Sequence, residues 1–89
     1  MRFYIVVVYD GRRYRYLVIY HGAGPHSEKF EVIGKNKSIF FISNRPLLQA
    51  KNLKHWAIKW TVEGRLNNVH YKELIARELE KWIVDTNLK

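Results

Sequence analysis

The first hydrophobic segment is an apolar run from Phe3 to Tyr9 that ends at the dipeptide Asp10-Gly11. Asp-Gly tolerates the positive φ angles of a type I′ turn, so the pattern predicts a β-hairpin closed by a two-residue loop. In that hairpin Tyr9 pairs with Arg12, and successive side chains alternate between two faces. One face is apolar and aromatic and comprises Phe3, Ile5, Val7, Tyr14, Tyr16 and Val18. The opposite face mixes apolar with basic side chains, namely Arg2, Tyr4, Val6, Val8, Arg13, Arg15, Leu17 and Ile19.

Three further segments have the alternation or the short apolar run of a strand, and they are 28–33, 38–43 and 55–63. Residues 21–27 (HGAGPHS) contain glycines and a proline and predict a loop, and residues 34–37 predict a turn. The stretch 44–52 has proline in its first turn followed by good helix formers, which predicts a short helix. Segment 55–63 alternates most cleanly, and it places Trp56, Ile58, Trp60 and Val62 on one face. Because each tryptophan of the chain lies on the apolar side of its element, we expect these rings in the core.

The last periodic segment, 69–85, has apolar residues at three- and four-residue spacing and predicts an amphipathic helix. Its apolar stripe consists of Tyr71, Leu74, Ile75, Leu79, Trp82 and Ile83. Asn67 or Asn68 is placed to cap the first turn. The polar side carries opposite charges four residues apart, Glu73 with Arg77 and Lys81 with Asp85.

The element order is therefore β-β-β-β-(short α)-β-α, which predicts an α+β fold in a single domain spanning residues 1–89. We expect a mainly antiparallel sheet of about five strands, with the long helix packed on the face that carries Trp56, Ile58 and Trp60. Short, strongly twisting strands also curl into open barrels, and the sequence leaves that alternative open.

The composition is that of a globular chain, with 47% hydrophobic residues and no cysteine. Without cysteine there is neither a disulfide framework nor a thiolate zinc site, which favours a reducing compartment. The apolar run of the first strand is too short for a membrane span, so we expect a cytoplasmic protein without a membrane partner.

The net charge of +8 is unevenly distributed along the chain. Residues 1–60 carry 11 Lys or Arg against 3 Asp or Glu, whereas residues 61–89 carry 5 of each, so the strand-rich part holds the whole excess. A basic surface of this kind is compatible with a polyanion partner, although excess charge also serves solubility. The candidate nucleic-acid-binding residues are Arg12, Arg13, Arg15, Lys35 and Lys37. In a strand Tyr14 and Tyr16 point away from Arg13 and Arg15, so these two residue types do not form one stacking platform.

Catalytic and cofactor chemistry finds little support in the sequence. Four histidines without a ligand-spacing motif predict no metal site, although His21 and His26 are close enough in sequence to meet across the glycine loop. That loop precedes a strand rather than a helix, which argues against a phosphate-binding loop. No serine stands in a nucleophile motif. The sequence therefore predicts a protein that is not an enzyme, and it indicates no cofactor and no small-molecule ligand.

The first strand is apolar on both faces, so Val6, Val8, Leu17 and Ile19 need a cover. The short helix, through Leu47, Leu48 and Leu53, or closure into a barrel would provide one and leave a monomer. Otherwise an apolar patch with a basic rim stays exposed, which is typical of an interface and favours a homodimer. Two hypotheses follow: a non-catalytic, nonspecific nucleic-acid-binding or nucleic-acid-associated module, and a protein-interaction or self-associating domain.

Overall fold

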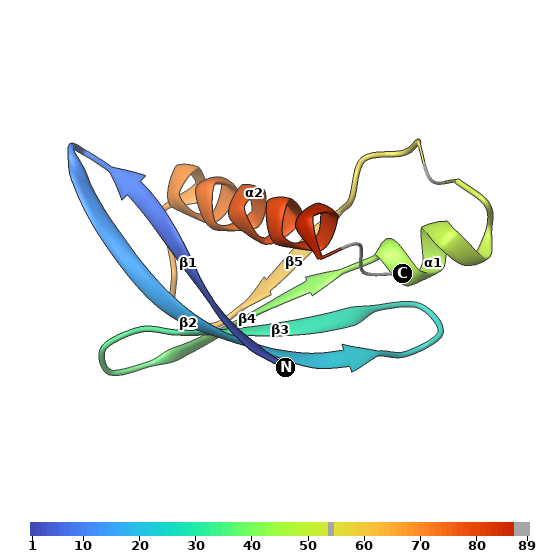
Figure 1. Ribbon diagram of the computed structural model, residues 1–89, viewed down its shortest axis with the longest axis horizontal. Coiled ribbons are helices and arrows are strands. Elements are labelled where there is room, and N and C mark those ends of the chain that lie inside the picture. Colours follow the sequence, from blue (N-terminus) through green and yellow to red (C-terminus); the bar gives the residue numbers. More distant parts are fainter. Residues whose placement is uncertain (54, 87–89) are drawn as a thin grey trace.

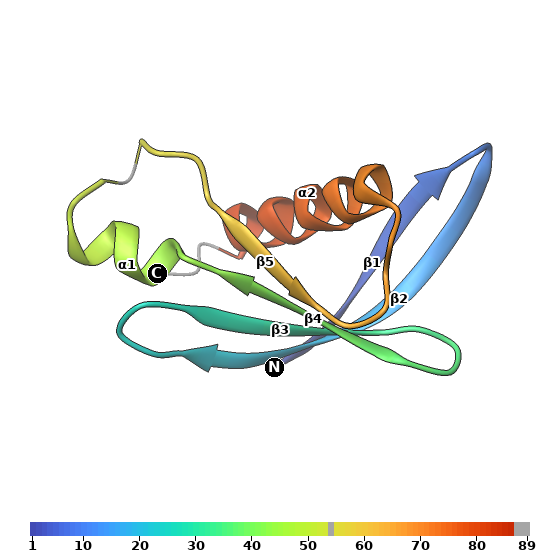
Figure 2. The same cartoon turned by 180° about the vertical axis from the view of Figure 1, so that it is seen from behind.

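The computed structural model describes residues 1–53 and 55–86 and has the predicted α+β architecture. Its elements are β1 (Arg2–Tyr9), β2 (Arg12–Ala23), β3 (Glu28–Ile33), β4 (Ser38–Ser43), α1 (Arg45–Ala50), β5 (Trp60–Glu63) and α2 (Val69–Asp85). The strands form one antiparallel sheet in the order β1-β2-β3-β4-β5. Figures 1 and 2 show α2 lying across one face of this twisted sheet. The sheet stays open, with β1 and β5 at its edges, so the barrel alternative does not occur.

The first hairpin has the predicted register from Arg2 opposite Ile19 to Tyr9 opposite Arg12. Asp10 and Gly11 have φ angles of 52° and 73°, as a type I′ turn requires. The second strand is longer than predicted, because it continues through a register shift to Ala23. Gly22 lies at that irregularity with a φ of 95°, a conformation that glycine adopts without strain. The predicted loop therefore shrinks to the turn that Gly24 N closes by donating to Ser27 O at 2.7 Å.

The prediction of a strand over 55–63 is wrong for its first half. β4 ends at Ser43, whose partner is Trp60, so the residues before Trp60 have no strand opposite them. These residues instead belong to the connection from α1 to β5, and Lys59 N donates to the side chain of Asn44, the N-cap of α1, at 2.8 Å. Trp56 consequently lies outside the core with 58% of its surface exposed, contrary to the expectation from alternation.

The short helix α1 forms as predicted, with Pro46 in its first turn. It lies beyond the end of β4 rather than over the first hairpin (Figure 1). Leu48 is its buried apolar residue. Because Val6 and Val8 remain 37% and 60% exposed, α1 does not provide their cover.

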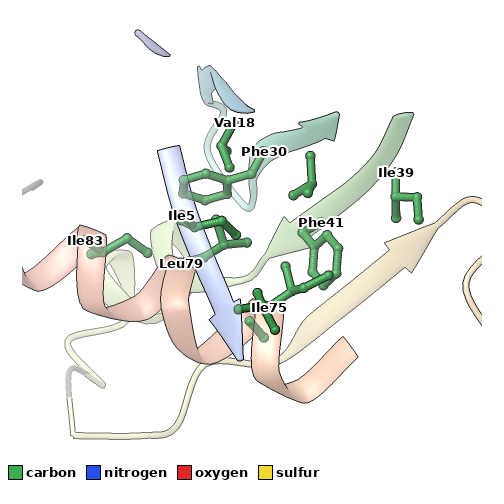
Figure 3. Close-up of a cluster of buried hydrophobic side chains, with 11 residues drawn as sticks. Ile5, Val18, Phe30, Ile39, Phe41, Ile75, Leu79 and Ile83 are labelled. Carbon is green, nitrogen blue, oxygen red and sulfur yellow. The ribbon is translucent and has the colours of Figure 1, made fainter. Parts of the chain in front are cut away.

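The long helix α2 has the predicted bounds, and Asn68 caps it by accepting a hydrogen bond from Tyr71 N at 3.0 Å. Its buried side chains, Ile75, Ala76, Leu79 and Ile83, meet a core contributed by β1 to β4 (Figure 3). Trp82 also stacks on Phe3 of β1, with ring centroids 3.9 Å apart. On the polar side, Lys81 pairs with Glu78 at 3.0 Å rather than with Asp85. The helices in the described part of the chain are too short or too polar to span a bilayer.

Candidate functional site

The face of the sheet that points away from α2, here called the outer face, is not covered by either described helix. Ile5, Val7, Val18 and Phe30 lie in the core and therefore point toward α2. The residues that alternate with them along the strands point to the outer face. The register then places the following side chains on it: Arg2, Tyr4, Val6, Val8, Arg13, Arg15, Leu17, Ile19, His21, Lys29, Glu31, Ile33, Ser38, Phe40, Ile42, Thr61 and Glu63. Neither α1 nor any other described segment is laid across this face in Figures 1 and 2.

Two aromatic rings on the outer face each lie beneath a cation. The guanidinium carbon of Arg15 is 4.0 Å from the ring centroid of Tyr4, and the Lys29 ammonium is 4.4 Å from that of Phe40. Both distances fall well within the range of cation–π attraction. Tyr4 is 58% exposed, and Phe40 is half-buried. The arrangement is a pair of basic-aromatic units on one exposed surface.

The balance of charge on the outer face is positive. Four of its residues are permanently basic, namely Arg2, Arg13, Arg15 and Lys29. Two are acidic, Glu31 and Glu63, and Glu31 is occupied by His21, whose Nε2 lies 2.8 Å from its carboxylate. That hydrogen bond is the main reason why the pKa of Glu31 falls below its ordinary value. The apolar remainder includes Val6 and Val8 along the edge strand, with Leu17 and Ile19 half-buried beside them.

The predicted nucleic-acid-binding residues fall into separate places. Arg13 and Arg15 share the outer face, whereas Arg12 has the register of Tyr9 on the helix side, at the tip of the hairpin. Lys35 and Lys37 lie in the β3–β4 turn, and Lys37 Nζ donates to the main-chain oxygen of Arg65 at 2.9 Å. The structure therefore brings together two of the five and adds residues that the sequence analysis did not select: Arg2, Tyr4, Lys29 and Phe40. The predicted register already placed Tyr4 on the same face as Arg13 and Arg15, so the sequence contained the information needed to select Tyr4.

The tyrosines of the Arg-Tyr stretch line a different site, on the helix side of the sheet. Tyr14 and Tyr16 contribute to a cavity of about 360 Å³ that the end of the first hairpin forms with the start of α2. The hydroxyl groups of Tyr16 and Tyr71 are hydrogen-bonded to each other. Burial, followed by this hydrogen bond, raises the pKa of Tyr71 well above that of a free phenol. These rings pack edge to face around Tyr71, on the opposite side of the sheet from the outer face.

A buried ion pair joins three strands to α1. The carboxylate of Glu28, 1% exposed, accepts hydrogen bonds from Arg45 Nε at 2.7 Å and Arg45 Nη2 at 2.5 Å. Ser43 Oγ and Tyr20 OH donate to the same carboxylate at 2.6 and 2.9 Å. Burial alone would raise the pKa of Glu28, but the hydrogen bonds from Arg45, Ser43 and Tyr20 outweigh it and hold the pKa below its usual range. A carboxylate occupied by four donors and shielded from solvent has a structural role.

The histidines do not converge in the structure. His21 is engaged by Glu31 on the outer face, and His26 is exposed in the β2–β3 turn. Among residues 1–53 and 55–86, no group of three metal-ligating side chains comes together. Comparison of the chain with protein-family models, curated proteins and solved structures gave no match. What the protein does is therefore inferred from the chemistry of its own surfaces.

Proposed function

We propose that this chain is a non-catalytic, cytoplasmic module that binds single-stranded nucleic acid through the outer face, without preference for base sequence. The observation that carries the proposal is the pairing of Arg15 with Tyr4 and of Lys29 with Phe40 on one uncovered sheet face. Proteins that hold single strands combine cations for the phosphates with rings on which bases stack. The outer face supplies both kinds of group.

The excess positive charge lies in the part of the chain that forms β1 to β4 and α1. Residues 1–60 carry the entire excess of positive charge, while residues 61–89, which include α2, are neutral. A polyanion is therefore attracted to this part of the molecule rather than to α2. On the outer face Arg2, Arg13 and Arg15 line the first hairpin, and Lys29 extends the basic surface to β3. Each phosphate neutralised by one of these groups releases counterions and makes binding dependent on salt.

The two rings set the spacing of the contacts. Tyr4 lies on β1 and Phe40 on β4, three strand positions away. Neighbouring strands are about 4.8 Å apart, so the rings are separated by roughly 14 Å across the sheet. A single strand of a few nucleotides spans that distance, within the usual site sizes of such proteins. Base faces are available for stacking in single strands but not inside a duplex, so the face favours the single-stranded form.

Fluorescence anisotropy tests the proposal at ~50 mM salt with a labelled oligonucleotide. A length of ~15 nucleotides lies within the site sizes of single-strand-binding domains. We expect single-stranded DNA and RNA to bind more tightly than a duplex of the same length, with little difference between base sequences. Tyr4→Ala should weaken single-strand binding by about 5- to 150-fold, which corresponds to the loss of one stacked base at about 1 to 3 kcal/mol.

The control substitution alters a tyrosine on the other side of the molecule. Tyr71→Phe retains an aromatic ring on the helix side and should leave single-strand affinity unchanged. Failure of the unaltered protein to bind any oligonucleotide at low salt contradicts the proposal. Equal affinity for Tyr4→Ala and the unaltered protein shows instead that stacking on the outer face plays no part.

A further inference from the structure

The edge strand β1 has the features of a strand that accepts a partner. It is eight residues long, whereas the other edge strand, β5, has four. Proteins protect sheet edges with lysine, proline, bulges or covering segments. The sequence of β1, RFYIVVVY, has one charged residue and no proline, and its register with β2 runs without a bulge. None of the described segments pairs with its free side.

The hydrogen-bonding groups that β1 offers follow from the register. Tyr20 N donates to Met1 O at 2.8 Å, which makes Met1 and Tyr20 a hydrogen-bonded pair of the antiparallel ladder. Hydrogen-bonded positions alternate along a strand, so the odd-numbered residues of β1 point their N–H and C=O groups toward β2. The main-chain groups of Arg2, Tyr4, Val6 and Val8 consequently point away from the sheet. An incoming strand meets this regular row of donors and acceptors.

Space for such a strand lies beside β1. A groove of about 290 Å³ separates β1 from the flank of α2, lined by Val6 and Val8 on the strand and by Leu74, Glu78 and Lys81 on the helix. This groove is on the opposite flank of α2 from β5, where Trp60 Nε1 donates to Glu80 at 2.7 Å. The helix therefore borders the free edge without closing it.

The sequence of β1 is complementary to itself in one antiparallel register. Only even-numbered residues point their main-chain groups outward, so each must pair with another even-numbered residue. When Val6 lies opposite the same residue of a second copy, Tyr4 lies opposite Val8, and Arg2 comes to the end of the other copy's β1, next to the turn residue Asp10. Both members of this last pair are exposed, and their charges are opposite. A shift by two residues in either direction places Arg2 opposite Val8 or past the hairpin turn, and it takes Arg2 away from Asp10.

We propose that the occupant of the β1 edge is a second copy of this chain, added antiparallel about a two-fold axis through Val6. The two sheets then form one sheet of ten strands, with both α2 helices on the same side. Main-chain hydrogen bonds join the copies, Tyr4 packs against Val8, and Arg2 lies near the oppositely charged Asp10 at the end of the other copy's β1. The outer face becomes continuous across the pair. The proposal does not depend on nucleic-acid binding, because it rests on the edge rather than on the face.

Disulfide cross-linking tests this register cleanly, because the chain contains no cysteine. In a hydrogen-bonded antiparallel pair the Cα atoms are about 5.5 Å apart, within reach of a disulfide. Val6→Cys should therefore form a covalent dimer under mild oxidation. Val8→Cys should not, because its counterpart lies four residues away along the strand, about 14 Å. Mixing Tyr4→Cys with Val8→Cys should give a cross-linked heterodimer, while neither variant cross-links alone.

Light scattering of the unaltered protein at micromolar concentration accompanies the cross-linking. We expect twice the chain mass of 10.7 kDa. Val6→Asp, which sets two carboxylates against each other at the axis, should restore the single mass, and Thr61→Asp on the opposite edge strand should not. A monomer overturns the second copy as the occupant, and oligonucleotide binding by that monomer leaves the proposed function intact. A dimer in which Val6→Cys fails to cross-link overturns the register.

Discussion

Removing the arginine of the buried ion pair should be the most damaging polar substitution in this protein. Arg45→Met keeps most of the side-chain length but withdraws two of the four hydrogen bonds to Glu28, at 2.7 and 2.5 Å. The carboxylate is 1% exposed, so water does not replace them. Leaving a buried charge without its partner typically costs about 3 to 5 kcal/mol. For 89 residues the whole free energy of unfolding is roughly 4 to 13 kcal/mol, so the loss is a large share.

Urea unfolding followed by circular dichroism measures this loss, and a second substitution isolates its cause. Adding Glu28→Gln to Arg45→Met removes the stranded charge while keeping an acceptor for Ser43 and Tyr20. The double variant should therefore be more stable than Arg45→Met alone. As a control, Lys81→Met breaks an exposed ion pair and should cost only about 0.3 to 0.5 kcal/mol. A loss below about 1 kcal/mol for Arg45→Met, or a double variant less stable than the single one, would refute this reasoning.

The same network gives the protein a defined sensitivity to acid. Because the pKa of Glu28 is lower in the folded than in the unfolded chain, its contribution to stability is complete above the unfolded pKa and declines as pH falls through the folded pKa. The free energy of unfolding should therefore fall more steeply below about pH 4.3 for the unaltered protein than for Glu28→Gln. Equal acid dependence of the two proteins contradicts this assignment.

Two further substitutions test how the core is closed. Leu79→Ala removes a side chain with no exposed surface from α2, and it should lower the free energy of unfolding in urea by about 2 to 5 kcal/mol. Val84 is 76% exposed on the same helix, so Val84→Ala should change the free energy of unfolding by less than about 0.5 kcal/mol. Gly64→Ala should lower the melting temperature, because Gly64 has a φ of 130° and an added Cβ would lie 3.2 Å from Ile39 Cγ1; an unchanged melting temperature would contradict this.

The parts of the fold that the sequence predicts correctly are those determined by local signals. Asp10-Gly11 fixes the first hairpin, and with a two-residue loop the whole register follows from it. The apolar stripe predicts α2, and of the two asparagines placed to cap it, Asn68 is the cap. The strand prediction failed for residues 55–59, because alternation is typical of a strand but does not show whether another strand lies opposite. Ser43 ends β4 where α1 begins, and that limit depends on tertiary structure rather than on the residues that alternate.

The candidate site could be predicted from the sequence only in part. Arg13 and Arg15 follow from charge and register, but sequence proximity directed attention to Tyr14 and Tyr16, whose rings face the helix side. The ring that meets Arg15 is Tyr4, which lies on the neighbouring strand. Lys29 and Phe40 come together across the β3–β4 pair. Contacts between strands depend on strand order and on which face the helix covers. Neither can be predicted from a single segment of the sequence.

Single-stranded nucleic acid should be bound by the outer face rather than attracted by the total charge alone. The salt dependence of oligonucleotide affinity tests it directly with two double variants that remove equal charge. Arg13→Ala with Arg15→Ala should weaken binding to every sequence and reduce the slope of log affinity against log salt by about 1.4, or ~0.7 for each lost phosphate contact. Arg65→Ala with Arg77→Ala, outside the outer face, should leave the slope unchanged. Equal losses from the two pairs would contradict the claim.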